Sequence, residues 1–221
     1  MKTGIFLALS LLLSASAFAA DADQSLLLAP TSTASAPDSM PSSSQKFSLG
    51  LGSGMNTFGG NAGKLFSRSS PVAEVRGEWA FSSAFSARAS AETASYSFNA
   101  VPNGAVDMST KALQAAAQWH YLTTALSGSG FDPYASAGVA QVFRTQTFRD
   151  HNSVEKDNAV AAALGLGTNY ALPGGKLGFW MEADASQIFF QDRYAQEYLA
   201  SGIEDTTGLL YSARLGVKYI F

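Results

Sequence analysis

The C-terminal stretch Leu209-Leu210-Tyr211-Ser212-Ala213-Arg214-Leu215-Gly216-Val217-Lys218-Tyr219-Ile220-Phe221 decides the fold. From Tyr211 to Phe221 every odd position is apolar or aromatic. The even positions between them hold Ser212, Arg214, Gly216 and Lys218, with Ile220 as the one apolar exception. A period of two is the spacing of side chains on one face of a β-strand. One face of this segment is therefore apolar, and the other carries charged, polar or small side chains.

The same alternation recurs in seven earlier segments, which are separated by turn residues such as Pro173-Gly174-Gly175. The fifth segment is the least regular, because Gln141 shares a face with Val139 and Phe143 when Arg144 faces inward. We expect a bulge or a slip there. The eight predicted strands cover residues 45–56, 72–81, 84–98, 110–122, 131–148, 158–172, 176–190 and 207–221.

Segment length and aromatic placement favour a membrane barrel over a soluble one. Each segment has at least the ~9 to 11 tilted residues that cross a bilayer, whereas ordinary strands centre on about 5 to 6. Aromatic residues gather where segments end at short turns or termini, and two such belts suit two lipid interfaces. The first belt is predicted from Phe47, Trp79, Phe81, Phe85, Trp119, Tyr121, Phe179, Tyr219 and Phe221. The second is predicted from Phe58, Phe98, Phe143 and the cluster Ile188-Phe189-Phe190.

The predicted fold class is all-β, an eight-stranded antiparallel up-and-down transmembrane β-barrel. An even strand number brings both chain ends to one side of the membrane. Short turns near residues 82, 126 and 174 are expected on the periplasmic side, together with both ends. The connections predicted to be longer, and to face outward, are 57–71, 99–109, 149–157 and 191–206.

The N-terminus has the pattern of an export signal. Lys2 is a short positive region, Ile5 to Leu13 is the apolar region, and Ala17-Phe18-Ala19 is a small-x-small cleavage site. The apolar run is roughly half of the ~20 residues that a spanning helix requires. We therefore predict a signal peptide over 1–19, a flexible periplasmic tail rich in Ser, Ala and Pro over 20–44, and the barrel over 45–221.

Composition excludes several classes of function. Only 14% of the residues are charged, against about a quarter in a typical soluble domain. There is no cysteine, which excludes a disulfide framework, a thiol nucleophile and a lipoprotein anchor. Loss of Lys2 with the signal leaves 13 basic residues against 17 acidic, and this balance argues against nucleic acid as a partner.

The closing run Leu215-Gly216-Val217-Lys218-Tyr219-Ile220-Phe221 resembles the terminal strand of outer-membrane barrels, which ends in an aromatic residue with apolar residues at alternate positions. Pro133-Tyr134-Ala135-Ser136-Ala137-Gly138-Val139 resembles the opening of a middle strand in the small barrels of outer membrane proteins A, X and W. The resemblance covers residues 45–221. It implies a bacterial outer-membrane location and recognition by the barrel assembly machinery. The residues predicted to carry that assembly signal are Leu215, Val217, Tyr219 and Phe221.

The polar face of the segments carries charges of both signs, and we expect these side chains to point into the lumen. An eight-stranded barrel is about filled by its side chains, so buried ions there must pair. One interpretation is a packed polar core, and the other is a set of pairs whose rearrangement opens a narrow water path. The predicted lumen charge network is Glu74, Arg76, Glu78, Arg88, Glu92, Glu182, Asp184, Arg214 and Lys218.

Three sequence features contain the residue types of catalytic or ligand-binding sites. His151-Asn152-Ser153 with Glu155 has the residue types of a serine hydrolase but falls in a predicted loop. His120 is interpreted as a hydrogen-bonded interior histidine, because a metal site needs three or four donors. Gly50-x-Gly52-x-Gly54 lies inside a strand, where it relieves crowding or eases curvature. No catalytic, cofactor-binding or metal-binding residue is predicted, and the chain is not expected to be an enzyme.

The predicted function is structural, an integral barrel that presents loops at the surface and has at most a narrow pore. The alternatives are a channel for small hydrophobic solutes resembling outer membrane protein W and, third, a lipid-modifying enzyme. Expected partners are outer-membrane lipid, lipopolysaccharide, the barrel assembly machinery and periplasmic chaperones. Tyr194, Tyr198 and Leu199 make the longest loop the expected contact surface for an extracellular ligand.

Overall fold

The computed structural model describes residues 46–66, 68–100, 104–121, 130–149, 153–173, 175–190, 202 and 207–221. Two compact units are distinguished, Met1–Ser44 and Gln45–Phe221, and the described residues all belong to the second. The predicted signal peptide and the predicted tail lie outside the described residues.

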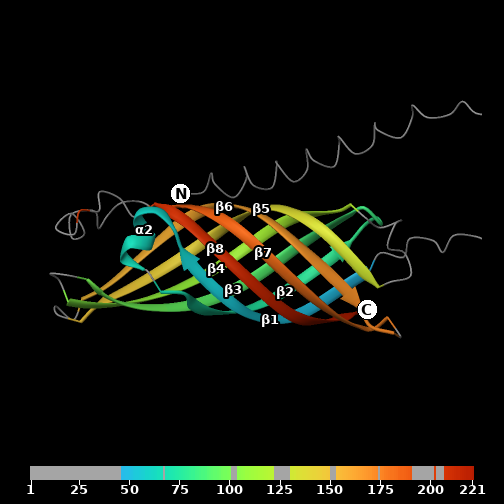
Figure 1. Cartoon of the computed structure of the whole chain (residues 1–221), viewed down its shortest axis with the longest axis horizontal. Helices are drawn as coiled ribbons and strands as arrows, with labels where there is room; N and C mark the ends of the chain where they lie inside the picture. The colour runs from blue at the N-terminus through green and yellow to red at the C-terminus, as the bar shows by residue number, and fades with distance from the viewer. Residues whose placement is uncertain are drawn as a thin grey trace, which may run out of the picture. The chain divides into compact units, whose positions relative to one another are not determined.

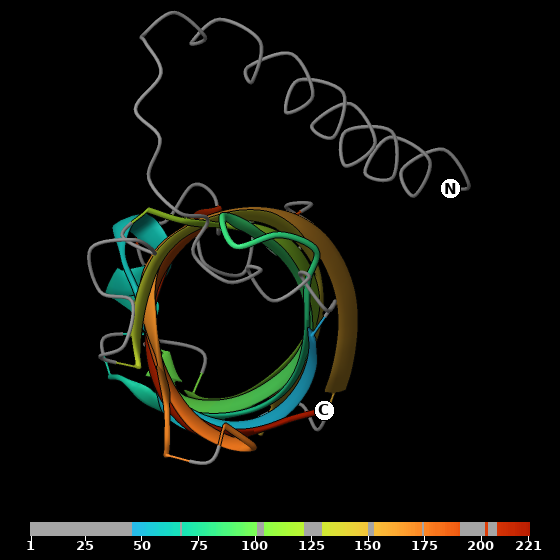
Figure 2. The same ribbon diagram turned by 90° about the vertical axis from the view of Figure 1, so that its right-hand side faces the viewer.

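Eight strands form one closed barrel in which each strand is antiparallel to both neighbours, and β8 pairs with β1 to close the ring. Figures 1 and 2 show the tilted strands from the side and the ring from one end. The predicted eight-stranded up-and-down barrel is confirmed. The strands are β1 (Lys46–Phe58), β2 (Ser70–Ala80), β3 (Phe85–Ala100), β4 (Gly104–His120), β5 (Phe131–Phe148), β6 (Ser153–Ala171), β7 (Leu177–Phe189) and β8 (Gly208–Ile220).

The two faces of the wall reverse the arrangement of a soluble protein. Leu164 is 69% exposed and Leu215 is 66% exposed on the outside, whereas Arg76 is only 1% exposed inside. Apolar surface on this scale is stable against lipid and costly against water. A closed barrel also satisfies every ladder hydrogen bond internally, as a bilayer requires.

We call the end of the barrel that holds the short turns after β2 and β6 the turn end. The start of β1 and the end of β8 lie here, because Ser48 pairs with Ile220 and Phe221 donates its N–H to the carbonyl of Phe47. The rings of Phe47 and Phe221 are 5.7 Å apart, and those of Tyr219 and Phe221 are 5.0 Å apart. Every member of the first predicted belt is exposed on the outer face, at 38% or more. A continuous aromatic belt therefore surrounds the turn end.

We call the opposite end the loop end, and here the prediction of a second belt is partly wrong. Phe143 and Phe189 do face outward, but Phe58, Ile188 and Phe190 are buried inside the barrel. The strand alternation explains the error, because these three side chains occupy even positions, as do the inward-facing polar residues of β1 and β7, Ser48, Asn56, Glu182 and Asp184. The side chain of Phe98 lies outside the described residues.

Two long connections predicted at the loop end are also wrong. The β3–β4 ladder continues to the pair Ala100 and Gly104, and the β5–β6 ladder continues to Phe148 and Ser153. Most of the predicted connections 99–109 and 149–157 is therefore strand. These segments resemble loops in sequence because, near the loop end, their outward-facing side chains are polar instead of apolar.

No bulge or slip interrupts β5, contrary to the sequence-based expectation. Its pairing with β4 and with β6 runs without a break in register. Gln141 stays on the outer face and donates its Nε2–H to the carbonyl oxygen of Ala159, 3.1 Å away on β6. The polar group is satisfied locally, so the strand has no need to shift.

A short helix not predicted from the sequence, α2 (Gly60–Leu65), follows β1 at the loop end. Ala62 on this helix is 1% exposed, and Phe66 directly after it is 4% exposed. The ring of Phe66 is 5.2 Å from that of Phe58 and 6.1 Å from that of Tyr96. No helix among the described residues is long and apolar enough to span a bilayer.

Candidate functional site in the barrel lumen

All nine residues of the predicted lumen charge network lie on the inner face of the wall. Eight of them are buried, and the side chain of Glu92 retains 14% exposure. The alternation of each strand places them there, because a shift of one residue would send every charge to the lipid side. A buried ion without a partner costs several kcal/mol, so the pairing among these side chains decides whether the lumen is stable.

Arg76 on β2 is the centre of the network. Its Nε donates to Glu74 Oε1 at 3.0 Å, and its other nitrogens contact Glu182 at 3.2 Å and Glu78 at 3.4 Å. Glu182 on β7 also pairs with Arg88 on β3. β3 and β7 are four strands apart in a ring of eight, so this pair spans the lumen.

Arg214 on β8 links a second group of carboxylates. It pairs with Asp184, and its guanidinium contacts Glu92 at 2.9 Å and Glu74 at 3.3 Å. Glu74 therefore joins the Arg214 group to the Arg76 group. Among the described side chains, these contacts make one connected polar core across the barrel.

Lys218 connects this core to the turn end. Its Nζ lies 2.5 Å from Glu78 Oε2 and 2.7 Å from Asn169 Oδ1. Tyr134 and Ser136 add hydroxyl donors to Glu182, at 2.8 Å and 3.2 Å. Each acidic side chain of the core thus has at least one partner, as a satisfied polar network requires.

Trp180 packs inside the lumen against the wall formed by β1 and β8, and glycines of these two strands explain how it fits. The guanidinium carbon of Arg76 lies 3.3 Å from the centre of the indole ring. A Cβ on Gly216 would lie 2.7 Å from Trp180 Cε2, and one on Gly50 would lie 3.2 Å from Nε1. A Cβ on Gly52 would overlap the indole outright. Gly50 and Gly52 of the predicted series thus make room for Trp180, whereas a Cβ on Gly54 would meet Ala213 and Arg214 instead.

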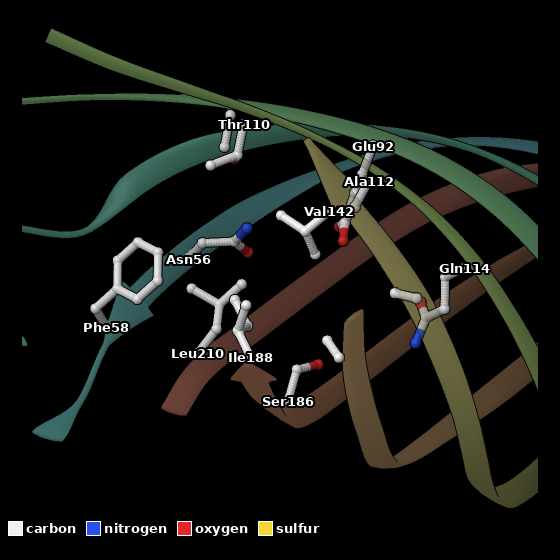
Figure 3. A pocket seen from close by; sticks show the side chains of 13 residues that line it. Asn56, Phe58, Glu92, Thr110, Ala112, Gln114, Val142, Ser186, Ile188 and Leu210 are labelled. Carbon is white, nitrogen blue, oxygen red and sulfur yellow. The ribbon is translucent and has the colours of Figure 1, made fainter. Parts of the chain in front are cut away.

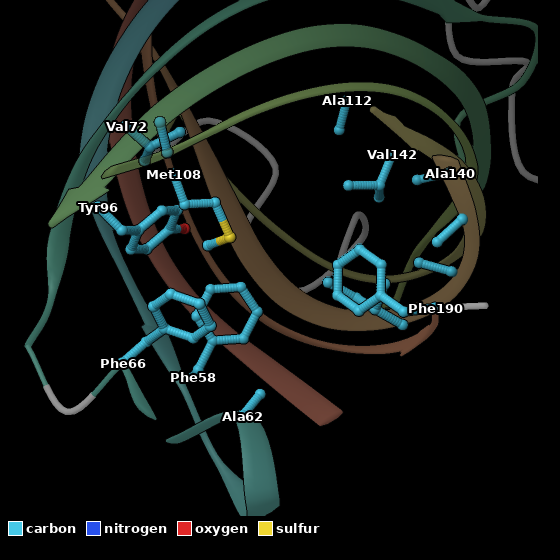
Figure 4. Packing of buried hydrophobic residues seen from close by; sticks show 14 residues of the cluster. Phe58, Ala62, Phe66, Val72, Tyr96, Met108, Ala112, Ala140, Val142 and Phe190 are labelled. Carbon is cyan, nitrogen blue, oxygen red and sulfur yellow. The ribbon is translucent and has the colours of Figure 1, made fainter. Parts of the chain in front are cut away.

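The loop end of the lumen is apolar, which sequence reasoning missed. Figure 4 shows the cluster, in which Tyr96 and Met108, cross-strand partners on β3 and β4, lie beside Phe58 and Phe66. Arg144 pairs with Asp157 at 3.0 Å and lies 3.8 Å over the ring of Phe190. The signal was available in the parity of the strands, since these apolar residues share the inward register of the charges.

A small cavity lies among residues of the apolar cluster, with Glu92 of the polar core at its edge (Figure 3). Its volume is about 20 Å³, which is room for about one water molecule. Asn56 and Ser186 line it together with Glu92, Val142 and Ile188. Even a small hydrocarbon solute is larger than this volume, so it cannot enter unless the walls of the cavity move.

A larger cavity opens at the turn end. Its volume is about 170 Å³, and it is lined by residues of seven strands, including Ser86, His120 and Asp132. Ser86 Oγ lies 2.8 Å from His120 Nε2, and a carboxylate oxygen of Asp132 lies 2.9 Å from His120 Nδ1. His120 is hydrogen-bonded on both ring nitrogens, and the described residues contain no cluster of metal-binding side chains.

The triplet His151-Asn152-Ser153 is not brought together as a described site. Ser153 opens β6 instead of lying in a loop, and Glu155 is two residues further along that strand. His151 and Asn152 lie outside the described residues, as do Tyr194, Tyr198 and Leu199.

No family model matches the chain, and no curated protein matches it in sequence. Solved structures match it in fold. Neisserial surface protein A (NspA) superposes with a TM-score of 0.51 at 12% identity, covering 79% of this chain and 95% of that one. A major outer membrane protein from Thermus thermophilus superposes with a TM-score of 0.51 at 15% identity, covering 80% and 99%. The chain has the fold of a small outer-membrane β-barrel.

This fold and the apolar exterior together support a location in a bacterial outer membrane.

Proposed function

We propose that the chain is a structural outer-membrane barrel with a lumen closed to ions, which presents its loop end at the cell surface. The observation that carries this proposal is the set of buried side-chain contacts that cross the lumen. Trp180 packs under the guanidinium of Arg76, and the Arg88–Glu182 pair joins opposite walls beside it. Water and ions have no described path past these side chains.

Planar-bilayer recording of the refolded protein tests the closed lumen. The wild-type protein should give no resolvable single-channel steps. Trp180→Ala should give steps, because the side chain that fills the gap beside Gly52 and Gly216 is removed. The matched control is Trp79→Ala, a tryptophan that is 49% exposed on the outer face, and it should stay silent. Large steps from the wild-type protein would reject the proposal.

A second candidate is passage of small hydrophobic solutes, which the apolar loop-end cluster favours. It requires movement of the wall, because the cavity beside the cluster holds only about 20 Å³. The chain has three tryptophans, so replacing Trp79 and Trp119 by Phe leaves Trp180 as the one fluorescent reporter in the lumen. Quenching by a brominated alkane, lost on Ile188→Glu, would favour this candidate over a closed barrel.

The proposal includes lipid, lipopolysaccharide, periplasmic chaperones and the barrel assembly machinery as partners. Tyr219 and Phe221 support the last of these, because both are exposed at the turn end on the strand that closes the ring. Phe221→Ala should slow insertion by purified assembly machinery in vesicles without lowering the stability of the inserted barrel. Equal insertion rates would remove the assembly signal from the proposal.

A further inference from the structure

We infer that the cavity at the turn end is a serine hydrolase site that cleaves small carboxylic esters. Ser86 would be the nucleophile and His120 the general base, and Asp132 orients the imidazole. The chain Ser86 Oγ, His120 Nε2, His120 Nδ1 and Asp132 carboxylate has contacts of 2.8 Å and 2.9 Å. A nucleophile, a base and an orienting carboxylate in hydrogen-bond reach are the geometry by which such sites are recognised.

Strand register brings the three side chains together from β3, β4 and β5. Ser86 pairs across the β3–β4 ladder with Gln118, and His120 is the next inward position on β4. His120 pairs with Tyr134 on β5, and Asp132 is the next inward position toward the turn end. The site therefore stands on rigid, adjacent strands at the rim of the barrel.

The hydrogen-bond pattern selects the tautomer that the chemistry needs. The carboxylate of Asp132 accepts only, so Nδ1 of a neutral His120 carries the hydrogen and Nε2 is free to accept the hydroxyl proton of Ser86. Asp132 retains 37% exposure of its side chain, whereas Ser86 is 3% exposed. The nucleophile is thus shielded, and the orienting carboxylate faces the opening.

The reaction balances with water as the second substrate. Ser86 Oγ bonds to the ester carbonyl carbon as His120 Nε2 takes its proton, and the C–O bond to the alcohol breaks as the alcohol oxygen takes that proton. Water then attacks the acyl-serine and gives a proton to His120. The bond to Oγ breaks, the proton returns to Ser86, and a carboxylic acid leaves. The net change is hydrolysis of one ester to one acid and one alcohol.

Gln118 competes with His120 for the Ser86 hydroxyl. Its Oε1 lies 2.8 Å from Ser86 Oγ, and His120 Nε2 lies at the same distance, whereas the hydroxyl has one hydrogen to donate. The reactive arrangement is the one in which this hydrogen points to His120.

The cavity limits the substrate. About 170 Å³ compares with the roughly 150 Å³ of an engineered cavity that binds benzene, so a short acyl or aryl ester fits and a long fatty acyl chain does not. The lining holds two lysines, Lys46 and Lys218, and two carboxylates, Glu78 and Asp132, so its charge selects neither an anionic nor a cationic ester. This activity is independent of whether the lumen conducts ions.

Covalent labelling of the full refolded chain in detergent micelles tests the inference. A fluorophosphonate with short alkyl groups should modify Ser86, as mapped by mass spectrometry, and the protein should hydrolyse p-nitrophenyl acetate. Ser86→Ala should abolish both signals. The matched control is Ser90→Ala, because Ser90 also faces the lumen and lies 3.5 Å from a glutamine, Gln114, with no histidine contact among the described bonds.

His120→Gln should lower the hydrolysis rate by about 10² to 10⁴-fold. Asp132→Asn should lower it while heat-modifiable gel migration shows an unchanged fold, a separation that a purely structural hydrogen bond would not produce. Absence of labelling in the wild-type protein would overturn the inference. So would equal labelling of the wild-type protein and Ser86→Ala, or loss of labelling in Ser90→Ala alone.

Discussion

The turn-end and loop-end halves of this barrel have opposite interiors. In the turn-end half the lumen holds the Arg76 and Arg214 networks, and the outer face is aromatic and aliphatic. In the loop-end half the lumen holds Phe58, Met108 and Ile188, while polar side chains such as Arg149 and Lys156 appear outside. The loop-end half thus resembles a soluble β-barrel built onto a membrane barrel.

The difference shows how one continuous set of paired strands can lie in lipid at one end and in water at the other. The backbone pairing does not change along β3, β4 or β5, so only side-chain choice at alternate positions responds to the surroundings. Within the bilayer, the outer face of the barrel contacts lipid instead of water, so polar side chains lie on the inner face. Beyond it, the hydrophobic effect acts in its ordinary direction and the interior becomes apolar.

The largest expected effect comes from breaking the turn-end network at its centre. Arg76→Met leaves Glu74 and Glu182 short of a partner and should lower the free energy of unfolding by about 3–5 kcal/mol. Urea unfolding in phospholipid vesicles measures it. Arg68→Met is the control, because Arg68 is exposed in the β1–β2 connection and its loss should change little. Equal effects would mean that the network contributes no stability.

The boundary between the two halves is mapped by moving a charge along the outer face of β6. Leu164→Arg should cost about 2–4 kcal/mol, because this side chain meets the middle of the bilayer. Val154→Arg, ten residues nearer the loop end on the same face, should cost about 0–1 kcal/mol. Both wild-type residues are more than half exposed, so burial alone does not separate them. Similar costs at the two sites would place both in lipid.

Packing of Trp180 is tested by filling one of its glycine neighbours. Gly52→Ala should lower the free energy of unfolding by about 1–3 kcal/mol, because the indole of Trp180 is the nearest neighbour of the added methyl and would overlap it. Gly77→Ala is matched to it, since its methyl would face outward at an ordinary 3.6 Å from Phe47. The same unfolding titration distinguishes the two variants, and a smaller cost for Gly52→Ala would mean that Trp180 moves freely.

Sequence alone predicted the strand number, the fold class and the inward direction of the charges, because each depends on period-two alternation. The prediction failed where the alternation was not applied to the last residues of a strand. Ile188-Phe189-Phe190 looked like one aromatic cluster, although neighbouring residues of a strand must point to opposite faces. Only Phe189 lies outside.

The contacts within the lumen were beyond sequence reasoning for a different reason. Glu182 and Arg88 lie 94 residues apart, and their pairing depends on the tilt and closure of the ring. The Ser86, His120 and Asp132 contacts likewise require the registers of two ladders at once. No local spacing in the chain carries that information.

The smallest expected effect concerns the exposed counterpart of the buried arginines, the pair of Arg149 and Asp107 at the loop end. Two hydrogen bonds of 2.8 Å from Arg149, together with one from the Ser97 hydroxyl, hold the pKa of Asp107 below its usual value. A lowered carboxyl pKa stabilises the fold above the unfolded value of about 3.9, and this contribution is lost as the pH falls through the folded pKa.

Arg149→Gln should therefore raise the pKa of Asp107 toward the usual value, as followed by NMR of its carboxyl carbon. Unfolding at neutral pH should stay unchanged within error, because both side chains are well exposed and solvent screens their attraction. The same chemical pair that stabilises the core at Arg76 would then contribute almost nothing at the surface. A loss at Arg149 as large as that at Arg76 would contradict burial as the cause of the difference.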